Sequence, residues 1–144
     1  MKKVLITMDS VHYDLHDGTG EGQEYASKCI GVVQSMDDEI HIVYEMGDSE
    51  GGELSTETLL IGSDYVKISR PGMGEDFMHF TAGEVTEFVS RTMYGDIFMN
   101  INTKELNICK KEKEIVIFIH YFLSVAGDTF TECRMDLNVK EIME

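Results

Sequence analysis

The chain of 144 residues has 12 lysines and arginines against 27 aspartates and glutamates, so its formal net charge is −15. Such an excess of carboxylates repels phosphate backbones and anionic lipid, so we expect neither nucleic acid nor a membrane as a partner. The length predicts a single domain, residues 1–144, large enough to bury a core without a disulfide framework or a structural metal.

Short runs of alternating apolar residues, rich in Ile, Val, Tyr, Phe and Thr, predict a protein built from β-strands. Clusters of Gly and Asp separate these runs, as expected for turns. Leu106 and Ile108 are out of phase with Ile101, which predicts a β-bulge or bend between Thr103 and Glu105. In chain order, strands are predicted at residues 3–13, 24–35, 39–46, 54–61, 64–70, 75–80, 85–94, 96–103, 114–125 and 129–141.

The carboxy-terminal hairpin permits an explicit register. If residues 126–128 form a three-residue loop, the opposing positions are fixed along both strands. Glu114 then faces Lys140, and this pair of opposite charges supports the alignment. The inward pairs are Leu123–Thr131, Tyr121–Cys133, Ile119–Met135, Ile117–Leu137 and Ile115–Val139.

Sequential strands with one apolar face each, and no helix to cover a sheet, must fold over as a sandwich or close on themselves. Closure is the arrangement that removes exposed strand edges. We therefore predict an all-β fold, a closed antiparallel barrel of 8–10 strands.

The amino terminus has only three consecutive apolar residues after its lysines, too few for the apolar region of a signal peptide. The longest aliphatic and aromatic run, residues 115–119, is far shorter than the ~20 residues that span a bilayer. Cys29, Cys109 and Cys133 are odd in number and form no CxxC pair, so neither a disulfide framework nor a zinc site is indicated. We expect a cytoplasmic protein with reduced thiols.

Several segments resemble one family of small bacterial proteins. The most specific is Arg91-Thr92-Met93-Tyr94-Gly95-Asp96, followed by a strand ending at Thr103, and residues 66–72, 78–80 and 121–123 also fit. In these segments the chain resembles the YwiB-like family over nearly its whole length. The resemblance implies a calycin-like barrel of the lipocalin type. It implies no activity, so no functional residue is carried over.

Motifs that suggest catalysis lack the setting that the chemistry needs. Residues 47–51 match GxSxG, but a nucleophile elbow requires a strand-to-helix turn, and the serine here has acidic neighbours. The glycine-rich residues 17–22 lack the Lys and the helix of a phosphate cradle. A possible metal site is suggested by four residues close in sequence, His12, Asp14, His16 and Asp17. The end of a strand and a loop fix no metal geometry, however. We predict no catalytic residue, no metal site and no cofactor, and thus no enzyme.

All three arginines lie in predicted strands, and the guanidinium is suited to fork-like binding of a carboxylate. Arg91 shares the parity of Val85 and Val89, so it is expected to point inward or toward a barrel mouth. Pairing with a carboxylate of the protein itself is the commoner role of such an arginine. The chain is interpreted as a barrel that binds a small apolar or amphipathic molecule, with predicted lining residues Tyr44, Arg70, Arg91 and Tyr121.

Phenylalanines on the predicted outward face of the last three strands offer an alternative function. Large exposed apolar patches mark interaction sites in proteins. This face would make the chain a structural or interaction module that forms a homodimer, unless other segments of the chain cover it. The predicted interface residues are Phe98, Phe118, Phe122 and Phe130.

Overall fold

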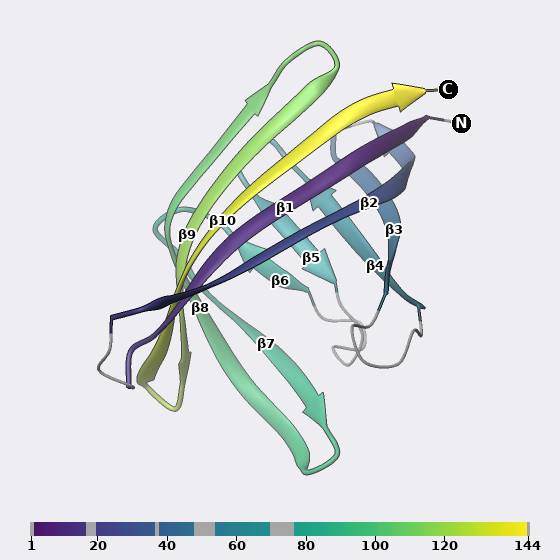
Figure 1. The fold of residues 1–144 in the computed structure, drawn as a ribbon. Coiled ribbons are helices and arrows are strands. Elements are labelled where there is room, and N and C mark those ends of the chain that lie inside the picture. The colour runs from purple at the N-terminus through teal and green to yellow at the C-terminus, as the bar shows by residue number, and fades with distance from the viewer. Residues whose placement is uncertain (1, 17–19, 37, 48–53, 70–76, 144) are drawn as a thin grey trace.

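The structure is a computed structural model that describes residues 2–16, 20–36, 38–47, 54–69 and 77–143. Within these ranges the regular structure is entirely β-strand (Figure 1). The strands are β1 (Lys3–Asp14), β2 (Gly22–Met36), β3 (Ile40–Gly47), β4 (Leu54–Ile61), β5 (Val66–Ser69), β6 (Met78–Phe80), β7 (Val85–Thr92), β8 (Gly95–Lys110), β9 (Glu114–Val125) and β10 (Asp128–Met143). No helix in the described ranges is long and apolar enough to cross a membrane.

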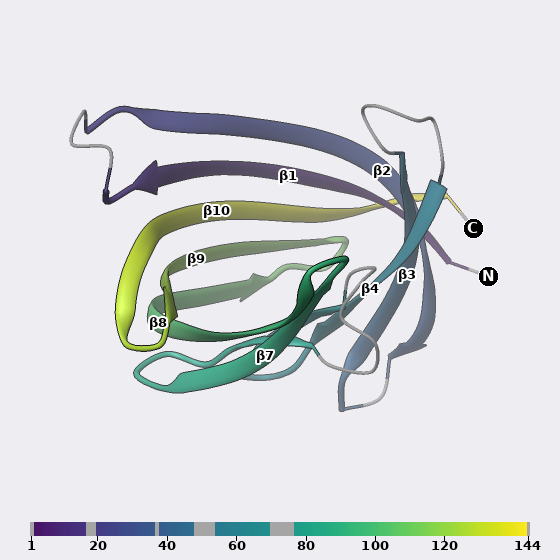
Figure 2. The same cartoon turned by 90° about the horizontal axis from the view of Figure 1, so that it is seen from below.

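The strands form one antiparallel sheet in the order β6-β5-β4-β3-β2-β1-β10-β9-β8-β7. The sheet curls until its two end strands meet, as Figures 1 and 2 show from two directions. At that seam the Thr86 hydroxyl on β7 donates a hydrogen bond of 2.6 Å to the carbonyl oxygen of His79 on β6. The predicted all-β antiparallel barrel is therefore confirmed, with a nearly closed seam between β6 and β7.

The register predicted for the carboxy-terminal hairpin is confirmed, from Leu123–Thr131 to Glu114–Lys140. The predicted three-residue loop is wrong, because Val125 pairs with Asp128 and only Ala126 and Gly127 lie between them. Both have positive φ, 52° and 83°, as a tight hairpin turn requires. A bulge between Thr129 and Thr131 takes up the additional residue, so the ladder beyond it has the predicted alignment.

Strand β8 continues to Lys110, past its predicted end at residue 103. The predicted bulge between Thr103 and Glu105 is confirmed. Because the bulge shifts the alternation by one residue, Leu106 and Ile108 return to the inward row and pack against the core. One long strand thus replaces the short one that simple alternation predicted.

Inward side chains from nearly every strand fill the barrel. Gly31 on β2 lies in this core, and a β-carbon at this position would be only 2.7 Å from Cγ2 of Ile42. The Phe80 and Tyr121 rings meet edge to face, 4.8 Å apart. The buried apolar residues are Val4, Ile6, Met8, Ile42, Tyr44, Leu59, Leu60, Ile61, Val66, Ile68, Met78, Phe80, Phe88, Ile101, Ile117, Ile119, Tyr121, Cys133, Met135, Leu137 and Val139.

The turn between β9 and β10 generates a stability prediction. Ala126 has a φ of 52°, a conformation that is unfavourable for a residue with a β-carbon. Ala126→Gly should raise the free energy of unfolding in urea by about 1 kcal/mol. The control is Ala82→Gly, in an exposed turn without positive φ, which should lower stability by about 0.5 kcal/mol. Equal effects of both substitutions would contradict the strain at Ala126.

Candidate binding site at the barrel mouth

The two predicted tyrosines lie inside the barrel. Tyr44 on β3 is 1% exposed and Tyr121 on β9 is 2% exposed. The Tyr44 hydroxyl donates a hydrogen bond of 2.9 Å to Oε1 of Glu57, a buried carboxylate on β4. Arg70 lies outside the described residues, and only the backbone of Arg91 is described, opposite Asp96. The described part of the chain therefore places both tyrosines in the core and does not unite the four predicted residues.

An apolar pocket of about 180 Å³ opens at one end of the barrel, on the inner face of the sheet. Val4, Ile42 and Val139 form its buried part, and half-buried Val33 and Ile115 extend it. These side chains come from β1, β2, β3, β9 and β10, which lie side by side in the sheet. Ile40 completes the apolar wall. The pocket thus exists only because the first and last strands are neighbours.

Charged side chains form a rim around this apolar wall, and we call the whole arrangement the mouth. Four of the nine lysines of the chain line it, although the chain as a whole is strongly acidic. With three glutamates beside them, the mouth has a local charge of +1 in a chain of formal charge −15. The rim residues are Lys2, Lys110, Lys111, Lys113, Glu112, Glu114 and Glu141.

Backbone hydrogen bonds hold the rim in place. The turn between β8 and β9 closes with a bond of 2.7 Å from the Lys111 amide to the Glu114 carbonyl. The Glu141 amide donates to the Lys113 carbonyl at 2.9 Å, which ties this turn to β10. Glu141 also binds Lys2, with Nζ and Oε1 2.7 Å apart. In the described ranges, the three lysines of the turn form no ion pair, so their ammonium groups face solvent at the pocket entrance.

The four phenylalanines of the predicted face do not form one continuous exposed patch. Phe118, Phe122 and Phe130 are half-buried, and only Phe98 of the four is largely exposed, at 69%. The Lys104 ammonium group lies over the Phe122 ring, 5.9 Å from its centroid. Self-association through this face stays a prediction, and among the described residues the most exposed apolar side chains lie near the β7–β8 turn.

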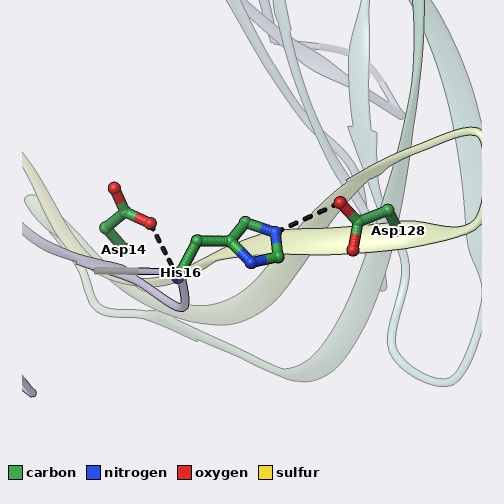
Figure 3. A network of polar contacts seen from close by, with 3 residues as sticks. All are labelled: Asp14, His16 and Asp128. Carbon is green, nitrogen blue, oxygen red and sulfur yellow. Dashed lines mark hydrogen bonds and ion pairs between the residues drawn. The ribbon is translucent and has the colours of Figure 1, made fainter. Parts of the chain in front are cut away.

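The histidine and aspartates near the end of β1 have a structural role (Figure 3). The His16 amide donates to Oδ1 of Asp14 at 2.9 Å, and its Nε2 lies 3.1 Å from Oδ2 of Asp128. The Leu15 amide donates to the Phe130 carbonyl at 3.0 Å, so this segment is fastened to β10. Among the described residues, no three His, Cys, Asp or Glu side chains come together as a cation site. Most of the GxSxG motif and half of the glycine-rich loop fall outside the described residues.

A cluster of titratable groups lies on the outer side of β3, β5 and β6. The Tyr65 hydroxyl donates to the carboxylate of Glu39, which lowers the pKa of Glu39 and raises that of Tyr65. The other Glu39 oxygen is 2.7 Å from Nε2 of His41. Burial lowers the pKa of His79, whose ring packs edge to face on Tyr65. An ionised carboxylate beside a protonated phenol is a stable pair at neutral pH, and not a pair poised to exchange a proton.

Comparison with known proteins places the chain in a family. Residues 6–137 match the model of DUF1934, described as a domain of unknown function. The chain belongs to the DUF1934 family. Its structure is similar to the crystal structure of the YwiB protein from Bacillus subtilis, with a TM-score of 0.75 and 17% identity over 99% of this chain and 93% of that one. No curated protein matches the chain.

The resemblance to the YwiB-like family is thus confirmed, and the structural match establishes the same fold. Sequence reasoning missed the mouth of this DUF1934 chain. Its walls come from five strands, and residues 110–113, with three lysines, lie between the predicted strands 96–103 and 114–125, where the pattern predicts only a connection. The available signal was the density of lysines in an acidic chain, because like charges gather where a ligand of opposite charge offsets their repulsion.

One buried hydroxyl generates a prediction for this DUF1934 chain. Thr103, at the bulge of β8 opposite Tyr121, is 1% exposed and its Oγ1 has no hydrogen-bond partner among the described residues. A buried hydroxyl without a partner is destabilising, so Thr103→Val should raise the free energy of unfolding by about 1 kcal/mol.

The same substitution at Thr86 is the matched control. Its hydroxyl donates to the His79 carbonyl across the seam, so Thr86→Val should lower the free energy of unfolding by about 1 kcal/mol. Urea titrations of both variants measure the two effects. A loss of stability on Thr103→Val would contradict the assignment and reveal a partner for that hydroxyl.

Proposed function

We propose that this protein is a non-catalytic binder of a small amphipathic molecule that carries an anionic group. The apolar part of the ligand occupies the mouth, and the lysines of the rim hold its anionic group. The observation that carries the proposal is the coincidence of an apolar pocket with Lys110, Lys111 and Lys113, three exposed lysines that have no ion-pair partner among the described residues. Apolar surface with a few convergent polar groups is the usual composition of a small-molecule site.

The volume of the pocket limits the ligand. A cavity of about 150 Å³ accommodates benzene, and the pocket here measures about 180 Å³. It therefore suits a single aromatic ring or a short aliphatic chain, with the polar end of the ligand outside. A fully enclosed ligand of lipocalin size does not fit these dimensions, since typical ligand pockets start at about 300 Å³.

The charge of the rim favours an anion over a neutral molecule or a cation. Lys110, Lys111 and Lys113 are exposed, so each contributes only about 0.2–1 kcal/mol to binding of a carboxylate. Because the three lysines converge on one entrance, their small contributions to the binding free energy add up. The remainder of the strongly acidic surface repels the same ligand, which makes the mouth the preferred place for an anion.

The titratable groups support binding and not catalysis. A catalytic acid or base has a pKa near the working pH, whereas the pKa of Glu39 is lowered and that of Tyr65 is raised. Burial also raises the pKa of the Cys29 thiol, and Glu57 adds to this effect, so Cys29 is a weaker nucleophile than an ordinary thiol. None of these three groups lines the mouth.

Titration with three six-carbon probes tests the proposal. Hexanoate, hexanol and hexylamine share an apolar chain and differ in charge. Hexanoate should bind most tightly and hexylamine most weakly, because the rim is cationic. Amide chemical shifts should move at Val33, Ile40 and Ile115, and stay unchanged at Tyr25, which lines a separate groove on the outer face.

Removal of two rim charges provides the second part of the test. Lys111→Gln with Lys113→Gln should raise the Kd for hexanoate about tenfold and leave the affinity for hexanol unchanged. Lys28→Gln is the matched control, because Lys28 is exposed on the outer face of β2. Equal affinities for hexanoate and hexylamine, or shifts confined to another region, would overturn the proposal.

A further inference from the structure

Strand β7 has one edge that, beyond its contact with β6 at Thr86, no described strand covers. It is the last strand in the sheet order and pairs with β8 along its other edge. Near its start the Thr86 hydroxyl reaches β6, but from Glu87 to Thr92 the described strands offer no partner to its backbone. Unpaired N–H and C=O groups on an edge strand form a template for another strand.

The hairpin of β7 and β8 also carries the most exposed apolar side chains of the described residues. Val85 is 63% exposed, Met93 88%, Tyr94 93% and Phe98 69%. Figure 1 shows the hairpin projecting beyond the rest of the sheet, away from the chain termini. Between residues 85 and 98 the only charged residues are one Arg, one Glu and one Asp, so this region escapes most of the repulsion between acidic chains.

We infer that the free edge of β7 pairs with β7 of a second copy of this chain. A two-fold axis perpendicular to the sheet makes this pairing antiparallel, and residues that face each other then point to the same side of the sheet. Phe88 is 6% exposed and points into the core, so the odd-numbered positions of β7 form the outer row. The axis passes through Val89.

Charge and apolar character select this register. With Val89 opposite the partner's Val89, Glu87 lies opposite the partner's Arg91, and symmetry repeats this pair. Val85 then lies next to the partner's Met93, in the turn that follows β7. If the axis moves by one residue, to position 88 or 90, both Glu87 and Arg91 lie opposite apolar residues of the partner chain. If it moves by two residues, to position 87 or 91, Glu87 lies opposite the partner's Glu87 or Arg91 opposite the partner's Arg91. Only the central register pairs opposite charges and groups the apolar positions.

Charge reversal tests the dimer. Glu87→Arg places arginines opposite each other at both symmetric positions, and Arg91→Glu places glutamates there. Each variant alone should raise the Kd of the dimer by about 30-fold. An equimolar mixture of the two should form heterodimers, because one chain then supplies only arginine and the other only glutamate. Native mass spectrometry distinguishes the heterodimer from both homodimers by mass.

Two controls make the result specific. Glu45→Arg makes the same charge change at an exposed position on β3 and should dimerise like the original chain. The double variant Glu87→Arg with Arg91→Glu again has opposite charges facing each other across the interface of two identical chains, and it should also dimerise. If either single variant is unfolded by circular dichroism, hydrogen exchange on the original chain still tests the dimer.

Hydrogen exchange supplies an independent measurement on the original chain. Protection of the Val89 amide should rise with protein concentration, and that of the Ile42 amide in the barrel core should not change. A chain that stays monomeric from micromolar to millimolar concentration would overturn the inference. So would single variants that dimerise undiminished, or a mixture that forms no heterodimer. The result is independent of hexanoate binding, because the mouth lies at the opposite end of β8.

Discussion

The ladder between β1 and β10 is the contact on which the barrel depends. Every other ladder in the described sheet joins strands that follow each other in the chain, so without this one the protein would be two separate meanders. The ladder places inward Ile6 beside Val139 and Met8 beside Leu137, and so makes one core from two apolar faces. Pairing the two ends of a chain costs considerable chain entropy, which the buried apolar surface must offset. The same ladder brings Lys2 to Glu141 and thereby builds the mouth.

Two of the bulges in the described sheet adapt long strands to this closure. Each adds a residue where strict alternation would turn apolar side chains outward, one after the hairpin turn of β9 and β10 and one within β8. Bulges also bend the strand and increase its twist, which a curled sheet requires. The bulge in β8 carries Thr103, whose buried hydroxyl lacks a described partner. A polar side chain at this position is thus accounted for neither by packing nor by hydrogen bonding among the described residues.

The two ends of β8 differ in chemistry. At its carboxyl end, lysines surround an apolar pocket, a combination suited to a small anion with an apolar body. At its amino end, the projecting hairpin combines a strand edge that no described strand covers beyond Thr86 with exposed apolar side chains and little charge, a combination suited to another protein surface. Because the length of β8 separates these ends, the proposed ligand binding and the proposed self-association would not compete for the same surface. Membership in the DUF1934 family and the likeness to YwiB establish the fold, and the two proposals concern what each end does.

The sequence by itself determined the number and approximate positions of the strands, the hairpin register and the bulge near Thr103, though not the length of β8, because these depend on local alternation, turn residues and charge pairs between neighbouring strands. It also placed Tyr44 and Tyr121 in the interior, since both share the parity of apolar neighbours.

The sequence could not determine which residues share the mouth, because Val33, Ile115 and Val139 meet only after the chain ends have paired. Nor could it distinguish covered phenylalanines from exposed ones. Phe122 and Phe98 have the same outward parity, but Lys104 lies over the ring of Phe122, while Phe98 lies on a hairpin that projects beyond the barrel. Tertiary structure decided these points, because the exposure of a side chain depends on which neighbouring strands and side chains cover it. Periodicity in the sequence indicates only on which face of its strand the side chain lies.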